Sequence, residues 1–518
     1  MGFAMVKSAV IDGLEVREVC VEADIGNGLP VFHMVGYLSS EVKEAGERVR
    51  TAIRHTKVRL QPQRMVVNLS PADIRKKGAS FDLPIAAALV LASGSIENRC
   101  QNKVLMIGEL SLDAKVRKVK GILPTVSFAR KHGFEICVIP RENEAEGHLV
   151  PGIEVIGVST LSEVWEFLEE GKKPHWVSVS VRKEKRTAGR LNYADIKGQS
   201  VLKRASEVAA AGGHNILYIG PPGSGKTMAA QRLGTILPDL DERTSMETTT
   251  IYSAAGLLDE TSPLVVRPPC REVHHTVTKA ALLGGGRYPS PGELSLANGG
   301  VLFLDEIHRL PPEGQEMLFM LLDKGEYRKL GANETSKDAR VLIIAATTEN
   351  LESSLLQTFL RRIPMTITKP SLEDRSIEER YELIEKFFRQ EYNQVKIPIH
   401  VKAKVMRALL SYDCKGNIGQ LKADIRLLCA NGFLEHISRQ DEVIRITLSL
   451  LQEHIYHGLL NSGKQKEVDD FLTMHDQDVF VYDQETKLER YDGEFLNIYE
   501  EMNRRFQDYE AKGYDNTK

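Results

Sequence analysis

The segment NILYIGPPGSGKTMAAQRL constrains the possible fold of this chain more than any other. Its centre fits the pattern GxxxxGK[ST], with an apolar stretch before it and a helical pattern after it. Such glycines let backbone N–H groups curl around phosphates, Lys226 adds charge for the β- and γ-phosphates, and the Thr227 hydroxyl binds Mg²⁺. We therefore predict a strand–loop–helix unit of a parallel α/β sheet that binds ATP and Mg²⁺. The loop residues predicted to contact the nucleotide are Gly220, Pro221, Pro222, Gly223, Ser224, Gly225, Lys226 and Thr227.

Two further apolar runs end in polar side chains suited to the same site. VLFLDE ends in Asp305, predicted to hold the magnesium through water, and in Glu306, predicted to orient and polarise the attacking water. VLIIAATTEN ends in Thr347, Thr348 and Asn350, which are suited to sensing the γ-phosphate. Three apolar runs of this kind are typical of a parallel sheet covered on both faces.

Composition sets the broad class. A chain of 518 residues with 42% hydrophobic and 27% charged residues is expected to form two to four globular domains. A net charge of −3 means that any nucleic-acid site must be a local patch. The six cysteines contain no CxxC pair, the N-terminus lacks a signal-peptide pattern, and no apolar run is long enough to cross a membrane. We expect a cytoplasmic protein with no membrane partner.

The pattern of apolar and polar residues divides the chain into five parts. The first is a mixed α/β or α+β domain, the second a basic linker, the third the nucleotide-binding sheet, the fourth a helical segment and the last an acidic tail. Their bounds are 1–178, 179–192, 193–370, 371–462 and 463–518. Strands are expected within 58–71, 134–140, 215–220, 301–305 and 340–348, and helices within 80–94, 126–133, 376–393, 400–413, 418–437 and 497–510.

With this strand order and the helical segment after Pro370, the core resembles AAA+ ATPases. The resemblance implies a helical lid and a ring, usually a hexamer, in which a neighbouring subunit inserts an arginine finger. Arg361 is the better finger candidate of the pair in TFLRRIP, although both arginines could be surface charge. GNIGQLKADIR resembles the second-sensor segment of these proteins, with Gly419 in place of the usual arginine and Lys422 as a possible substitute.

Residues 1 to about 303 resemble the ComM/YifB family of magnesium-chelatase-like ATPases. The matching stretches include MVVNLSPADIRKKGASFDLPIAAALV, DIKGQSVLKRASEVAAAGGHN and VHHTVTKAALLGGGRYPSPGELSLANGGVLFLDE. Family members are bacterial AAA+ ATPases, among them a hexameric DNA branch-migration helicase. The resemblance also implies that the first domain is similar to the Lon proteolytic domain. Ser80 stands at the serine position, but Leu123 occupies the position of the lysine base, so we expect no proteolysis.

From Asp305 onward the chain resembles LevR-type transcription activators, which remodel RNA polymerase carrying the enhancer-dependent sigma factor. The matching stretches are DEIHRLPPEGQEMLFMLLDKGEYRKLG, TFLRRIPMTITKPSLEDRSIEERYELIEKFF and GNIGQLKADIRLLCANGFLEHI. The GAFTGA loop that grips the sigma factor is replaced by the sequence at 280–293. The sequence thus indicates a mosaic joined near residue 300, and three functions stay open: a motor acting on DNA, a sigma-factor remodeller, and an ATP-gated scaffold.

Four other features have two possible interpretations. His274 and His275 are adjacent and make a poor metal pair, which favours a structural role. The glycines at 284–286 and Arg287 suit either a pore loop on DNA or a hairpin tip. Two basic groups suit either phosphate contacts or a solvated surface. The group in the first domain comprises Arg48, Arg50, Arg54, Lys57, Arg59 and Arg64, and the group in the linker comprises Arg182, Lys183, Lys185, Arg186 and Arg190.

Overall fold

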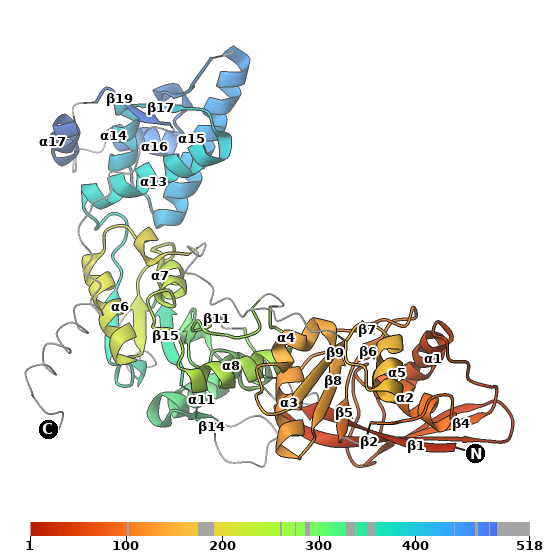
Figure 1. The fold of residues 1–518 in the computed structure, drawn as a ribbon. Coiled ribbons are helices and arrows are strands. Elements are labelled where there is room, and N and C mark those ends of the chain that lie inside the picture. The colour runs from red at the N-terminus through yellow and green to blue at the C-terminus, as the bar shows by residue number, and fades with distance from the viewer. Residues whose placement is uncertain are drawn as a thin grey trace, which may run out of the picture. The chain divides into compact units, whose positions relative to one another are not determined.

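The computed structural model separates the chain into two compact units (Figure 1). The first contains residues 1–220 and 225–369, and the second contains residues 221–224 and 370–518. The residues that the structure describes are 2–100, 103–174, 191–259, 262–274, 276–284, 291–327, 337–338, 340–349, 358–439, 441–460, 465–475 and 477–483. Within these ranges, no helix combines the length and hydropathy needed to cross a membrane.

A seven-stranded mixed sheet forms the N-terminal part of the first unit, in the order β3-β4-β2-β1-β5-β8-β9. Its strands are β1 (Gly2–Asp12), β2 (Glu15–Gly26), β3 (Phe32–Val35), β4 (Arg64–Ser70), β5 (Val104–Met106), β8 (Ile136–Pro140) and β9 (Glu154–Val158), and a separate pair is β6 (Glu109–Leu110) with β7 (Val116–Arg117). The helices are α1 (Ser40–Arg54), α2 (Asp82–Ala92), α3 (Ile122–Lys131), α4 (Glu144–Gly147) and α5 (Leu161–Glu170). The predicted strands within 58–71 and 134–140 and the predicted helices within 80–94 and 126–133 are confirmed as β4, β8, α2 and α3.

Alternating residues of these strands feed two apolar layers. Val138 of β8 belongs to the apolar cluster that includes residues of α1, α2 and α5, while its neighbour Cys137 belongs to the cluster that includes residues of α3. The alternation follows from the two-residue period of a strand, which sends successive side chains to opposite faces. The run LPIAAALVLA in α2 carries no charge, and its apolar residues are not confined to one side of the helix. Such a helix is stable when it is buried on all sides, as α2 is.

The nucleotide-binding part of the first unit is built on a five-stranded sheet, ordered β11-β12-β15-β10-β16. All four neighbouring pairs are parallel. The strands are β10 (Ile216–Ile219), β11 (Cys270–Val273), β12 (Val301–Leu304), β15 (Leu342–Thr347) and β16 (Met365–Thr368), and the short pair is β13 (Glu326–Tyr327) with β14 (Lys337–Asp338). The helices are α6 (Ser200–Gly212), α7 (Lys226–Leu233), α8 (Glu242–Ala255), α9 (Lys279–Leu283), α10 (Glu293–Leu296) and α11 (Pro312–Lys324).

The three predicted apolar strands are confirmed at the centre of this sheet as β10, β12 and β15. All fourteen of their residues are buried. Both faces are covered, because Leu302 and Leu304 enter one apolar cluster and Val301 and Phe303 enter another. The prediction of a parallel sheet with two covered faces therefore holds.

The second unit combines helices with a three-stranded sheet, ordered β18-β17-β19. Its main elements are α13 (Ile377–Val395), β17 (Ile399–Lys402), α14 (Ala403–Ser411), α15 (Asn417–Arg439), β18 (Ile444–Ile446), α16 (Glu453–Tyr456), α17 (Gln465–His475) and β19 (Val479–Tyr482). The helices predicted within 376–393 and 418–437 are confirmed. The helix predicted from 400 was wrong in its first turn, because His400 and Val401 pair with Arg445 and Ile446 of β18 and with β19, which lie far along the sequence.

Candidate active site

The phosphate loop connects β10 to α7 as predicted. Gly223 and Gly225 adopt left-handed φ values of 73° and 90°, which favour glycine and turn successive backbone N–H groups toward one side. Lys226, the first residue of α7, is buried, and its Nζ donates a 2.7 Å hydrogen bond to the Gly220 carbonyl. Burial lowers the pKa of Lys226, and the nearby carboxylates of Glu306 and Asp305 oppose that shift. Thr227 follows in the same turn and is half-buried.

Asp305 and Glu306 follow β12 at the same edge of the sheet as the phosphate loop. Burial raises the pKa of Asp305, and the backbone N–H of Glu306 donates to its Oδ1 over 3.0 Å. Glu306 has a left-handed φ of 49°, which is uncommon for a residue with a side chain. The Thr348 hydroxyl, at the end of β15, donates to Glu306 Oε2 over 2.9 Å. The structure therefore brings together Lys226, both carboxylates and Thr348.

His308 completes this group, and the sequence prediction missed it. Its Nδ1 lies 2.9 Å from Thr347 Oγ1 and 3.4 Å from Glu306 Oε2. The side chain comes from a short 3-10 helix at Ile307–Arg309, directly after the carboxylates. The signal in the sequence was a histidine two residues beyond Glu306 in DEIH, within reach of the neighbouring strand end.

Lys369 is a second residue that the sequence prediction missed. It follows β16, is almost fully buried, and donates from Nζ to the Gly225 carbonyl over 2.9 Å. Its backbone N–H also donates to the carbonyl of Ile219 at the end of β10. The strand before it, MTIT, is only partly buried, so the rule that identified Asp305 at the end of a buried strand does not identify Lys369.

In the second unit, residues 221–224 of the phosphate loop contact the start of α15 and Arg375, which lies two residues before α13. The Asn417 amide group donates to the Pro222 carbonyl over 2.9 Å, and the Ile418 N–H donates to Gly223. Buried Arg375 donates from Nη2 to the Ser224 carbonyl over 3.0 Å. Lys422, predicted from the sensor resemblance, lies exposed on α15. Arg375 and Asn417 were not predicted; the arginine in LEDR was the available signal.

Arg361 and Arg362, which lie between β15 and β16, differ in their surroundings. Arg362 is held by Asp323, with 2.9 Å between Nε and Oδ1, and its guanidinium lies 4.7 Å from the centre of the Phe319 ring. Arg361 is exposed. Of the two, Arg361 is thus the more exposed side chain.

The donor set fits a magnesium ion held together with a nucleotide. Within the described ranges, no group of three or more His, Cys, Asp or Glu side chains could hold a metal by itself. Mg²⁺ in phosphate-loop sites is instead held by one or two protein oxygens, substrate phosphates and water. Asp305 and Thr227 provide such oxygens. The Ser224 hydroxyl is buried and has no hydrogen-bond partner among the described residues, as expected of a loop that faces a polar ligand.

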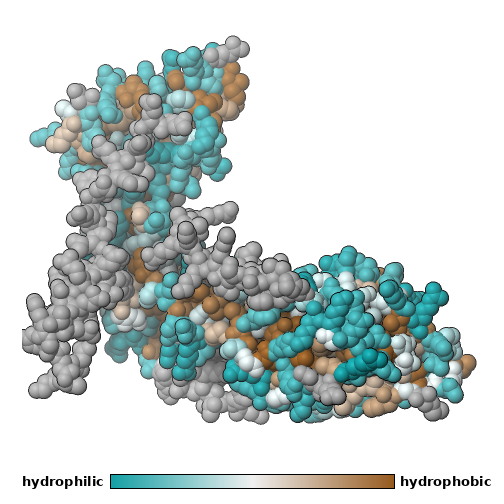
Figure 2. All heavy atoms as spheres, in the orientation of Figure 1, coloured by the Kyte–Doolittle hydropathy of each residue, from teal (hydrophilic) through white to brown (hydrophobic). Residues whose placement is uncertain are grey.

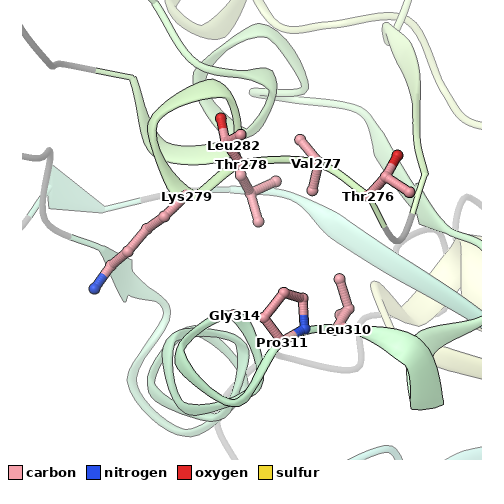
Figure 3. Close-up of a pocket in the computed structure, with 8 residues that line it drawn as sticks. All are labelled: Thr276, Val277, Thr278, Lys279, Leu282, Leu310, Pro311 and Gly314. Carbon is pink, nitrogen blue, oxygen red and sulfur yellow. The ribbon is translucent and has the colours of Figure 1, made fainter.

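A small pocket of about 210 Å³ lies apart from these residues (Figure 3). Val277 and Leu282 form one wall, and Leu310 and Pro311 face them from the start of α11. The Lys279 side chain extends away from this gap. The pocket contains none of the predicted nucleotide residues.

The remaining predicted positions have mostly structural surroundings. Leu123 is buried, and its N–H donates to Glu146, so the position expected of a lysine base carries no ionisable side chain. Arg48 is not part of a free basic cluster, because it forms two hydrogen bonds with the fully buried Asp82. All six cysteines are free thiols. The predicted features at His275, Gly285–Arg287, Asn350, the linker basic group and the helix within 497–510 lie outside the described residues.

A phosphate loop and two carboxylates at the carboxyl edge of a parallel sheet define a P-loop nucleotide-binding protein. The family model "Magnesium chelatase, subunit ChlI" matches residues 192–354, and "Subunit ChlI of Mg-chelatase" matches residues 21–143. Competence protein ComM of Haemophilus influenzae is 35% identical over 374 residues, covering 71% of this chain and 73% of ComM. The chain belongs to the ComM/YifB family of magnesium-chelatase-like proteins.

Two further relatives show how far the similarity extends. An uncharacterised protein of Mycobacterium tuberculosis is 40% identical over 324 residues, covering 62% of this chain and 64% of that protein. The matched part of this chain therefore spans less than two thirds of the mycobacterial relative. Transcriptional regulatory protein LevR of Bacillus subtilis is 39% identical over 282 residues, covering 52% of this chain and 28% of LevR. Because the ComM and LevR matches cover 71% and 52% of the chain, the two resemblances overlap instead of meeting at one residue near 300.

Proposed function

We propose that this protein hydrolyses ATP. The observation that carries the proposal is the convergence of Lys226, Asp305, Glu306 and Thr348 at one edge of the parallel sheet, with Thr348 2.9 Å from Glu306. Ligands of open α/β sheets bind beyond the carboxyl ends of the strands, where these side chains lie.

Each residue then has a role that follows from its chemistry. The loop N–H groups and Lys226 bind the phosphates, and Asp305 and Thr227 hold Mg²⁺, which supplies positive charge to the phosphate oxygens when bound. Glu306 accepts a hydrogen bond from the attacking water and polarises it, while Thr348 and His308 orient the Glu306 carboxylate. Arg361 reaches the site of a neighbouring subunit in a hexameric ring, and the second unit acts as the AAA+ lid.

We further propose that the work done with ATP is remodelling of DNA, such as branch migration. Support comes from family membership, because the relative ComM is named a competence protein and the match to it covers 71% of this chain. The N-terminal sheet domain would be a Lon-like fold without peptidase chemistry, since Leu123 stands where a lysine base is needed.

The test is an ATPase measurement on the purified full chain, alone and with a four-way DNA junction. The wild type should hydrolyse ATP faster with the junction. Lys226→Ala should lose nucleotide binding, whereas Glu306→Gln should keep binding and lose at least about 100-fold in kcat. Normal turnover in either variant would overturn the ATPase proposal. Failure of the wild type to bind forked DNA with ATP at low salt would overturn only the DNA part.

LevR supports a second candidate, a remodeller of the enhancer-dependent sigma factor, because it is 39% identical over 52% of this chain. The two candidates differ in the segment 280–293, where a sigma-factor grip would be needed and where GAFTGA is absent. Trapping the protein with a transition-state analogue of ATP hydrolysis, in the presence of the sigma factor, distinguishes the two candidates. Stable capture favours the regulator, and no capture together with DNA stimulation favours the DNA motor.

A further inference from the structure

The α15 helix of the second unit is apolar on two faces. Leu421, Ile425, Leu428 and Cys429 face the core of the unit. On the other side a second row is exposed, with Leu427 at 47%, Leu434 at 64% and Ile437 at 57% exposed surface. Figure 2 shows hydrophobic surface over the part of the second unit where Figure 1 places the end of α15. A row of exposed apolar side chains along one side of a helix commonly marks a surface that packs against another element.

The exposed row has the spacing of a two-helix seam. Together with exposed Ala423 and Ala430, it places apolar residues at 423, 427, 430, 434 and 437, which alternates steps of four and three. That alternation is the repeat by which one helix packs along another. The small Ala423 and Ala430 leave room for large side chains on the partner, and exposed Lys422 and Arg426 flank the row with positive charge.

The tail of the same chain carries a matching pattern. The sequence from 495 to 509, which lies outside the described residues, has Phe495, Tyr499, Met502, Phe506 and Tyr509 at the same four–three alternation. Both rows span fifteen positions. The tail supplies large apolar residues where α15 supplies alanines, and residues 494–510 include five acidic and two basic residues, opposite in sign to Lys422 and Arg426.

Local signals also favour a helix in this segment. Glu500 and Arg504 are four residues apart, as are Glu501 and Arg505, and Glu before Arg is the favourable order on a helix. Gly513 follows shortly after the last apolar position, where helices commonly stop.

The connection is long enough for the segment to reach α15 of its own chain. The structure describes the chain to Asp483, just after β19, so eleven residues (484–494) precede Phe495. Fully extended, such a connection spans up to roughly 40 Å. The strand β19 lies two places from β18 in the same sheet, which is about 10 Å, and α15 packs against β18.

From these observations we propose that residues 495–509 form a helix that docks along the exposed row of α15 in the same chain, Ala423, Leu427, Ala430, Leu434 and Ile437. This interface is independent of the proposed ATPase. Because α15 begins at Asn417, whose amide group holds the phosphate loop at Pro222, the docked segment would lie on the helix that contacts the nucleotide loop.

A cysteine crosslink in the full chain tests the docking. The middle position of each row, Ala430 and Met502, faces the other in either helix orientation, so Ala430→Cys with Met502→Cys needs no assumption about direction. Cys20, Cys100 and Cys270 are changed to serine, and the buried native cysteines are kept. A short bis-maleimide should join 430 to 502 within monomers, as read by gel and peptide mass spectrometry. The matched control, Ala430→Cys with Asn503→Cys, turns the second cysteine by about 100° on the helix and should crosslink several-fold less.

Each other result overturns the proposal. Crosslinks found only in dimers would assign the face to a second copy of the chain. Equal yields at 502 and 503, or no crosslink at either, would mean that no ordered helix lies on this face. As a second measurement, amide hydrogens of 495–509 should exchange slowly in the wild type and at least about tenfold faster in Leu427→Glu, which keeps the buried face of α15 intact. Fast exchange in the wild type would exclude docking.

Discussion

Two side chains position Glu306. One is Thr348, at the end of the neighbouring strand β15, and the other is His308, in the short 3-10 helix that follows Glu306. Thr348 donates to its Oε2, and His308 lies 3.4 Å from the same atom while contacting Thr347. A general base must be held within hydrogen-bond reach of its proton, so a residue that fixes the carboxylate matters for turnover although it touches no substrate. His308 is therefore a positioning residue for the proposed hydrolysis.

We expect His308→Ala to lower kcat about tenfold, the worth of roughly one hydrogen bond, with little change in the KM for ATP. His308→Asn should recover most of the rate, because its amide can reach the position of Nδ1. Steady-state ATPase assays give both constants. Arg309→Ala, an exposed neighbour on the same turn, is the control and should behave as the wild type. A rise in KM with unchanged kcat would instead assign His308 to nucleotide binding.

Arg48 and Asp82 form a pair that sets a pH dependence of stability. Asp82 is fully buried, and burial raises its pKa although Arg48 opposes the shift. A carboxyl with a raised folded pKa costs stability as pH rises through that pKa, because the folded state must then hold the charge. Without Arg48, no cation opposes the effect of burial on the Asp82 carboxylate. The pH range over which this carboxylate costs stability therefore becomes wider.

Arg48→Met should therefore lower the free energy of unfolding by about 3–5 kcal/mol near neutral pH, where Asp82 is left as an unpaired buried charge. The loss should be smaller at an acidic pH, because protonation neutralises the carboxyl. Urea unfolding at both pH values measures this, and Arg48→Met combined with Asp82→Leu should recover much of the stability. A pH-independent loss would show that packing, not charge, is what Arg48 provides.

At the scale of elements, the strands that carry the site were predictable and the small sheet of the second unit was not. VLFLDE and NILYIGPPGSGKT are continuous in sequence, so each places its own polar residue at a strand end. By contrast, β17 forms because Ile399 pairs with Ile444 and Tyr482, which are 45 and 83 residues away. Local periodicity cannot report such distant pairing, and the pattern around His400 was therefore interpreted as helix. Buried Lys369 and Arg375 were missed for a related reason. Their side chains donate to carbonyls of the phosphate loop, which lies about 150 residues earlier in the sequence.

The start of α15 gives an element-scale prediction. Asn417 has a left-handed φ of 56°, donates to Pro222 and accepts a 2.8 Å hydrogen bond from the Leu372 N–H. Asn417→Ala should destabilise the second unit by about 2–3 kcal/mol, because it removes both bonds and strains the backbone. Asn417→Gly should lose less, since glycine accepts the positive φ. Denaturant unfolding, with hydrogen exchange of the α15 amides as the readout, measures the loss of stability in each variant. Equal losses in Asn417→Ala and Asn417→Gly would show that backbone strain at this position does not contribute.

At the scale of the whole first unit, a buried polar cluster ties the N-terminal sheet domain to the nucleotide-binding part. Glu146 is buried in α4 and accepts from the Leu123 N–H over 2.9 Å and from Asn143 over 3.0 Å. It also accepts from the Ser253 hydroxyl of α8, and Gly121 donates to the Ser253 carbonyl. The α3 helix packs along α8 (Figure 1). Met246 of α8 packs against the apolar cluster of the sheet domain. The two parts are thus joined through buried hydrogen-bonding groups.

If this cluster joins the two parts, Glu146→Gln should separate their unfolding. The amide would present its NH₂ to groups that are themselves donors, leaving a buried polar atom unsatisfied at a cost of about 1–3 kcal/mol. Thermal unfolding of residues 1–369 within the full chain should change from one transition to two, because the contact between the parts, and not either core, is weakened. Ser253→Ala should show the same direction with a smaller effect, of about 1 kcal/mol. Thr250→Ala is the matched control on α8, since that hydroxyl donates to the Met246 carbonyl of its own helix. A single transition in Glu146→Gln, lowered to the same extent as in Thr250→Ala, would mean that the apolar contacts of α3 with α8 suffice to join the parts.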